Sequence, residues 1–179
     1  NLVEGIRSAL AKKGLEDGRV GIAGLDVLPV EYYQSLAKAL PKVVFENAGA
    51  ILEGQRLIKS SAEIEVLRAA AGVADQALQA GMEAARPGAT EHDIELAARE
   101  AALAAGADFV ARVRVSTGKR ISSLNWPMVS GRELEEGDLV YLDFIGWFEN
   151  YGFDNSRVTV VGTPDDRQRE YLNHLVDAL

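Results

Sequence analysis

The sequence predicts an α/β segment followed by an α+β segment, and the hydrophobic periodicity along the chain supports both parts. Residues 2–45 alternate between helical stretches and short β-branched stretches, a pattern typical of strands joined by helices. Residues 57–106 predict two alanine-rich helices. From residue 109 apolar side chains recur at every second position, so the last part of the chain predicts paired strands.

The first segment predicts two parallel strands with a helix between them. A helix over residues 2–13 precedes the first strand, Arg19–Ala23. The next helix begins near Pro29 and ends near Pro41, and Val43–Phe45 is the second strand. Because a helix joins these strands, we expect them to pair in parallel. Roughly 55 residues are few for closing such a layer, so we also expect the chain to be part of a longer polypeptide.

The two alanine-rich helices have recognisable starts and ends. The first follows Ser60 and ends at Arg86–Gly88, where Pro87 cannot continue a helix. Thr90 and Asp93 have the spacing of a capping box, so the second helix begins there and stops at Gly106. The predicted buried stripe of the first helix consists of Ile64, Leu67, Ala71, Ala74 and Leu78.

The last part of the chain predicts strands, a hairpin and the start of a third helix. Its predicted elements, in chain order, are the strand Phe109–Val115, a polar loop from Ser116 to Trp126, the turn Gly137–Asp138, the strand Leu139–Phe148, the hairpin tip Glu149–Gly152, the strand Phe153–Val161 and a helix from Thr163.

The composition excludes several classes of partner and site. The 179 residues include no cysteine, so any metal must have oxygen or imidazole ligands. The net charge is −8 and the basic residues are scattered, which argues against a nucleic-acid partner. No apolar run approaches the ~18 residues that span a bilayer, and no signal segment opens the sequence. We therefore expect no membrane partner and a cytoplasmic protein.

The hairpin contains two acidic residues that its geometry brings together. Asp143 shares one face of its strand with Ile145. One register has a turn centred on Glu149–Asn150, and Asp154 then lies opposite Ile145 and diagonal to Asp143. A turn centred one residue earlier places the two Asp residues directly opposite each other. Both registers hold the carboxylates within roughly 5–8 Å on one face, provided that no bulge changes the strand parity.

Two close carboxylates among apolar strand residues predict a bound cation. Like charges repel, and a buried charge is costly unless an opposite charge compensates it. Oxygen ligands suit Mn, Co, Fe or Zn at a two-metal site. The alternative interpretation is that one Asp lies exposed at the hairpin end and pairs with Arg157.

The motif around these acids resembles the metal-binding hairpin of the creatinase/prolidase/methionine aminopeptidase superfamily. Asp154 follows Asp143 by eleven residues, and Tyr151–Gly152 supplies the aromatic–glycine pair before it. The stretch Arg56–Ser60 resembles the junction between the two domains of that superfamily, and Gly88–Glu91 resembles the turn before its next helix.

This resemblance implies the domains and the activity. Residues 1–56 would be the end of a creatinase-like N-terminal α/β domain, and residues 57–179 the first half of a pita-bread catalytic domain. The activity would be that of a metal-dependent hydrolase of the Xaa-Pro dipeptidase or aminopeptidase type, which cleaves an amide bond. Its substrate would be a short peptide or another small molecule, and its partner a second copy in a homodimer.

The resemblance also implies roles for individual residues. Asp143 would bind one ion and Asp154 would bridge two, either manganese or Co, Fe or Zn, which together would activate a water. Arg157 would brace the Asp154 carboxylate. The remaining ligands, a His and two Glu, would lie beyond residue 179, so we expect these residues alone to be inactive. His92 and His174 are expected to be ordinary helix residues.

One departure from the superfamily concerns the loop before the Gly137–Asp138 turn. Its peptidases usually have a substrate-contacting His in this loop, whereas Ser122–Pro127 contains none. Asn125 occupies the approximate position, where it could donate a hydrogen bond to an oxyanion but cannot carry a proton; alternatively it is a turn residue. Two other functions therefore stay open: a relative that acts on another small C–N substrate, and an inactive pita-bread binding module.

Overall fold

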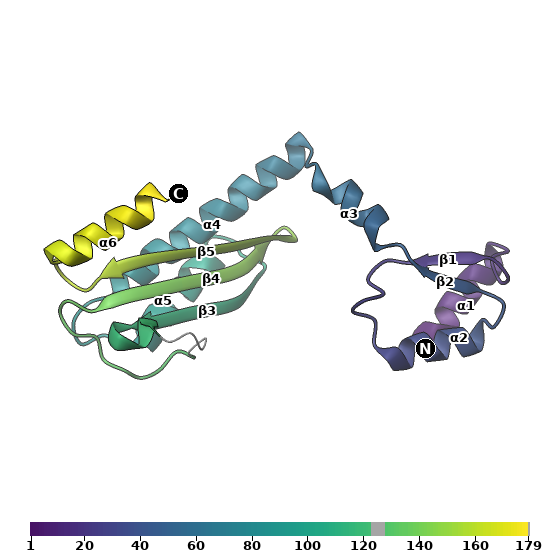
Figure 1. The fold of residues 1–179 in the computed structure, drawn as a ribbon, viewed down its shortest axis with the longest axis horizontal. Helices are drawn as coiled ribbons and strands as arrows, with labels where there is room; N and C mark the ends of the chain where they lie inside the picture. The colour runs from purple at the N-terminus through teal and green to yellow at the C-terminus, as the bar shows by residue number, and fades with distance from the viewer. Residues whose placement is uncertain (123–127, 179) are drawn as a thin grey trace. The chain divides into compact units, whose positions relative to one another are not determined.

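The computed structural model describes residues 1–122 and 128–178, which form two compact units, Asn1–Ser60 and Ser61–Leu179. Figure 1 shows the elements of each unit along the chain. The division after Ser60 lies within a few residues of the predicted boundary after Arg56. The assignment of the two units to two domains of the superfamily stays a prediction.

The first unit is built on a two-stranded parallel sheet. Its elements are α1 (Leu2–Lys12), β1 (Arg19–Ile22), α2 (Val30–Ala39), β2 (Val44–Asn47) and α3 (Gly49–Leu57). Strands β1 and β2 pair in parallel with Arg19 opposite Val44, which confirms the prediction made from the helix between them. Helix α3 is not predicted by the sequence pattern. The buried apolar side chains described in this unit are Leu36, Leu40 and Val43, so its core is small.

The second unit is a three-stranded antiparallel sheet with helices. Its elements are α4 (Ser61–Ala84), α5 (Glu91–Ala104), β3 (Phe109–Thr117), the 3-10 helix η1 (Gly118–Ser122), β4 (Leu139–Phe148), β5 (Tyr151–Val160) and α6 (Asp166–Asp177). The strand order is β3-β4-β5, so each strand pairs with its neighbour in the sequence. No helix of the described residues is both long and apolar enough to cross a membrane.

Helices α4 and α5 pack against one face of this sheet, as Figure 1 shows. The strand side chains that face them include Val115, Leu142 and Phe144, all fully or almost fully buried. Helix α4 approaches the sheet closely at Gly81, where an added Cβ would lie 2.5 Å from Leu142 Cδ2. The small residues of the helices therefore bring their backbones close to the sheet.

The buried face of α4 differs in part from the predicted stripe. Ala74 and Leu78 are buried as expected, but Ile64 and Ala71 are exposed. The buried positions are Ala70, Val73, Ala74, Ala77, Leu78 and Gly81. Consecutive alanines at 69–71 leave the helical phase undetermined in the sequence, because each of them suits either face.

The β4–β5 hairpin has the first of the two predicted registers. Ile145 pairs with Asp154. The turn consists of Glu149 and Asn150, whose φ angles of 47° and 64° are those of a two-residue hairpin turn. Tyr151, expected at the hairpin tip, is the first residue of β5, and its hydroxyl donates to Glu63 of α4 over 2.8 Å.

Strand β3 pairs with β4 and contains a bulge. Val110 pairs with Gly146, and Arg112 pairs with Ile145, so Ala111 is the extra residue. Beyond the bulge, Arg114 pairs with Asp143. Because side chains alternate along a strand, Arg112 and Arg114 lie on the face opposite α4 and α5.

Two helix starts were predicted from capping residues, and the structure confirms one of them. Thr90 caps α5 in a reciprocal capping box with Asp93. Helix α6 begins later than expected from Thr163, because Asp165 is its cap and Gln168 completes the box.

Candidate metal centre

The two acidic residues of the hairpin lie on the sheet face that points away from α4 and α5. Two neighbouring rows of side chains cross the three strands on this face. One row is Arg114, Asp143 and Ser156, and the next is Arg112, Ile145 and Asp154. Asp143 and Asp154 are thus diagonal neighbours on one face, at the ~7–8 Å that is usual for such pairs.

Asp143 is buried and held by donors on both sides. It is 5% exposed. Ser156 Oγ donates to Asp143 Oδ1 over 2.8 Å, and Arg114 Nη1 donates to Oδ2 over 3.2 Å. Ser156 Oγ also lies 3.2 Å from the hydroxyl of Tyr141. The carboxylate therefore has one fixed orientation, set by strands β3 and β5.

Asp154 has a different environment from Asp143. It is exposed, and it has no hydrogen-bond or ion-pair partner among residues 1–122 and 128–178. An ionised carboxylate offers about four lone-pair sites and no donor, so the free oxygens of Asp154 are suited to a cation.

The chemistry of this pair fits two ligands of a larger metal site. Both are hard oxygen donors on neighbouring positions of a rigid ladder, which suits divalent cations. The described residues contain no group of three or more His, Cys, Asp or Glu side chains that could hold a metal ion by themselves. Asp143 and Asp154 would thus be part of a ligand set.

The other predicted site residues lie elsewhere. Arg157 points to the helical side of the sheet, where its Nη2 lies 3.4 Å from Asp75 Oδ1 in an exposed ion pair. This is the ion-pair role considered for Arg157 as the alternative, and its contact with Asp154 stays a prediction. Asn125 lies outside the described residues. His92 and His174 are exposed helix residues.

A second acidic residue, Glu91, is fully buried at the first position of α5. Its Oε1 accepts from the backbone N–H and the hydroxyl of Thr117, over 3.1 and 2.8 Å. Its Oε2 accepts from the N–H and the hydroxyl of Ser130, over 2.9 and 2.7 Å, and from Arg120 Nη1. One carboxylate thus joins α5 to the chain on both sides of residues 123–127. The sequence contains no signal for this role, because the partners lie 26 to 39 residues away.

Arg132 and Asp138 extend this network toward the start of β4. Arg132 donates to both oxygens of Asp138, over 2.6 and 3.1 Å, and also to the Thr117 hydroxyl. Burial acts to raise the pKa of Asp138, but the hydrogen bonds from Arg132 and from the Glu135 N–H, with the Arg132 charge, lower that pKa below its ordinary value.

The Asp138→Asn variant is therefore expected to lose about 1–3 kcal/mol of unfolding free energy at pH 7. A lowered native pKa contributes stability above the unfolded pKa of about 3.9, and this contribution is lost as the pH falls through the native pKa. The deficit of the variant should thus shrink in acid. Urea unfolding at pH 7 and pH 3 measures it, with the exposed Asp166→Asn as control. A deficit of equal size at both pH values would contradict the role of the ionised carboxylate.

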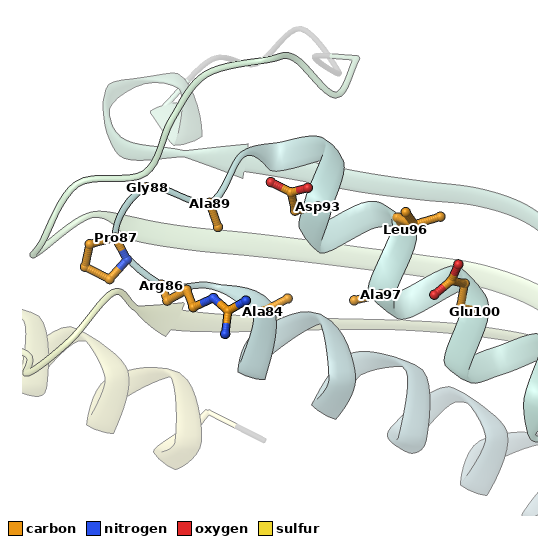
Figure 2. A pocket seen from close by; sticks show the side chains of 9 residues that line it. All are labelled: Ala84, Arg86, Pro87, Gly88, Ala89, Asp93, Leu96, Ala97 and Glu100. Carbon is orange, nitrogen blue, oxygen red and sulfur yellow. The ribbon is translucent and has the colours of Figure 1, made fainter.

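A pocket in the same unit does not include the two hairpin acids. Figure 2 shows it between the end of α4 and α5, with Arg86 on one side and Asp93 and Glu100 on the other. Its volume is about 570 Å³. Asp93 already accepts from the Thr90 N–H and hydroxyl, over 2.7 and 2.8 Å, as part of the helix cap. The pocket lies on the helical side of the sheet, away from Asp143.

Comparison with known proteins decides the family. Residues 65–179 match the sequence profile of metallopeptidase family M24. This chain belongs to that family. The match confirms the predicted pita-bread superfamily and agrees with the mixed α/β architecture.

Individual M24 proteins resemble most of this chain. A Xaa-Pro dipeptidase of Pyrococcus horikoshii is 27% identical over 161 residues, which cover 88% of this chain and 46% of that protein. An uncharacterized peptidase of Bacillus subtilis is 36% identical over 151 residues, which cover 82% and 41%. The crystal structure of a Xaa-Pro dipeptidase from Bacillus anthracis superposes with a TM-score of 0.85 at 28% identity, covering 99% of this chain and 49% of that one. The chain thus spans less than half the length of these curated M24 relatives.

Proposed function

We propose that this chain supplies Asp143 and Asp154 to the two-metal site of a hydrolase that cleaves an amide bond in short peptides of the Xaa-Pro type. The observation that carries the proposal is the β4–β5 register, which puts both carboxylates on one open face of the sheet. The names of the similar M24 proteins support the substrate class. The remaining ligands would come from residues beyond 179, and the protein would act as a homodimer.

The residues of this chain have separate tasks in that reaction. Asp143, in its fixed orientation, would bind one ion, and the exposed Asp154 would bridge the pair. Bound ions, whether Mn, Co, Fe or Zn, would supply Lewis acidity and an activated water. Phe144 and Leu142 on the opposite face anchor the strand in the core, so the position of Asp143 is fixed relative to the helices.

The metal content of the complete protein tests this function. We expect about two equivalents of a divalent metal per chain and hydrolysis of Xaa-Pro dipeptides. The Asp154→Ala variant should lose bound metal and turnover while staying folded, because its side chain is exposed and supports no other contact. The exposed Asp166→Ala serves as the control.

The outcomes separate the possible functions. Unchanged metal stoichiometry in Asp154→Ala would refute the bridging role. A folded wild-type protein that contains no metal would support the binding module. Two bound ions without Xaa-Pro hydrolysis would support the relative with another C–N substrate, the alternative that the histidine-free segment Ser122–Pro127 raises.

A further inference from the structure

Arg114 is a charged residue of the metal face to which the sequence pattern assigns no role. It lies directly opposite Asp143 in the β3–β4 ladder, and its Nη1 donates to Asp143 Oδ2 over 3.2 Å. Both side chains are nearly buried, at 13% and 7% exposed. Arg114 therefore provides positive charge beside Asp143 within the described residues.

This contact compensates for the burial of a carboxylate. An ionised carboxylate removed from water is strongly destabilising unless a cation or several donors take the place of the water. Ser156 provides one neutral hydrogen bond to Asp143, and Arg114 provides both a hydrogen bond and a charge. In the metal-free protein, Arg114 thus supplies the charge that a metal ion would supply when bound.

The effect of Arg114 on metal affinity follows from this exchange. A bound dication neutralises Asp143, so the attraction between Arg114 and Asp143 contributes less to the metal-bound protein than to the metal-free one. The guanidinium is always charged and also repels a nearby dication. A residue that stabilises the metal-free state more than the bound state lowers the affinity for the metal.

We propose that Arg114 is the resident cation of the Asp143 carboxylate: it positions this ligand before metal is bound and sets the affinity of the site. This inference rests on the proposed metal-binding role of Asp143. A hydrogen bond to a charged group corresponds to about 10- to 100-fold in an equilibrium constant, which is the expected size of the effect.

The chain offers a matched control for this test. Arg112 is on the same strand and the same face, two residues from Arg114, but it pairs with Ile145 and is exposed. Arg112→Met and Arg114→Met remove the same charge and leave the same side chain. Only the second removes the contact with Asp143.

Titration of the metal-free complete protein with Mn²⁺, followed by calorimetry, measures the affinity, and thermal unfolding without metal measures the stability. We expect Arg114→Met to bind Mn²⁺ at least about tenfold more tightly than the wild type and to unfold at a lower temperature without metal. Arg112→Met should change the affinity by less than about threefold. Arg114→Lys keeps the charge, so its affinity should lie between wild type and Arg114→Met; it also serves if the methionine variant does not fold without metal.

The results distinguish this inference from the proposed function. Unchanged or weaker Mn²⁺ binding by Arg114→Met, with two ions still bound by the wild type, would overturn the role of Arg114 alone. An equal gain in affinity in Arg112→Met would overturn it as well, because the effect would then come from net charge. A wild-type protein that binds no metal would refute the proposed function, and this inference with it.

Discussion

Replacing Glu91 with alanine is expected to destabilise the second unit by about 3–5 kcal/mol, since removing one partner of a buried charged network leaves the others uncompensated. Glu91 is fully buried and accepts from Thr117, Ser130 and Arg120. Without its carboxylate these donors lose their acceptor, and each buried donor left unsatisfied is costly. Urea unfolding of the complete protein, followed by circular dichroism, measures the loss.

Two variants control for this result. Glu100→Ala makes the same replacement on the same helix at an exposed position and should change the unfolding free energy by less than about 0.5 kcal/mol. Glu91→Gln keeps the side-chain volume but removes the charge, so it should share most of the loss. If Glu91→Ala were as stable as Glu100→Ala, the network would have no part in holding this region together.

The second large effect is expected from Phe144→Ala, at about 3–5 kcal/mol. Phe144 is 0% exposed and stacks on Phe153 with ring centroids 5.6 Å apart and an interplanar angle of 4°. The truncation would leave a cavity between β4, β5 and α4, directly behind Asp143. The midpoint of denaturant unfolding should fall accordingly.

The exposed Phe109 is the matched residue for this truncation. It is 59% exposed and contacts Trp147 at the edge of the sheet, with ring centroids 6.0 Å apart. Phe109→Ala should cost at most about 1.5 kcal/mol, the range of an aromatic pair. Equal losses in the two variants would show that the Phe144 side of the sheet is not the core of the unit.

The hairpin could be predicted from the sequence because its geometry is local. Strand alternation and a two-residue turn fix which residues face each other, and Ile145 pairs with Asp154 as one of the two proposed registers requires. The predicted parity depended on a hairpin without bulges. The bulge of the described sheet lies at Ala111 in β3, outside the hairpin, so the two acids stay on one face.

The partners of these acids could not be predicted, because they depend on pairing between distant segments. Arg114 reaches Asp143 only through the β3–β4 register, 29 residues apart. Arg157 was expected near Asp154 from sequence proximity, but it is the third residue after Asp154 and so points to the other face. The donors to Glu91 come from three positions in a long connection that has no periodicity.

The strand that carries Asp154 is fastened to α4 at two points, by Tyr151 with Glu63 and by Arg157 with Asp75. Both contacts come from the side of β5 that faces the helix, while Ser156 and Asp154 serve the opposite side. The hairpin and the helix should consequently move as one lever. A displacement at the N-terminal end of α4 would be transmitted to the acids and not absorbed by a joint, so substitutions on this helix can retune the site without touching it.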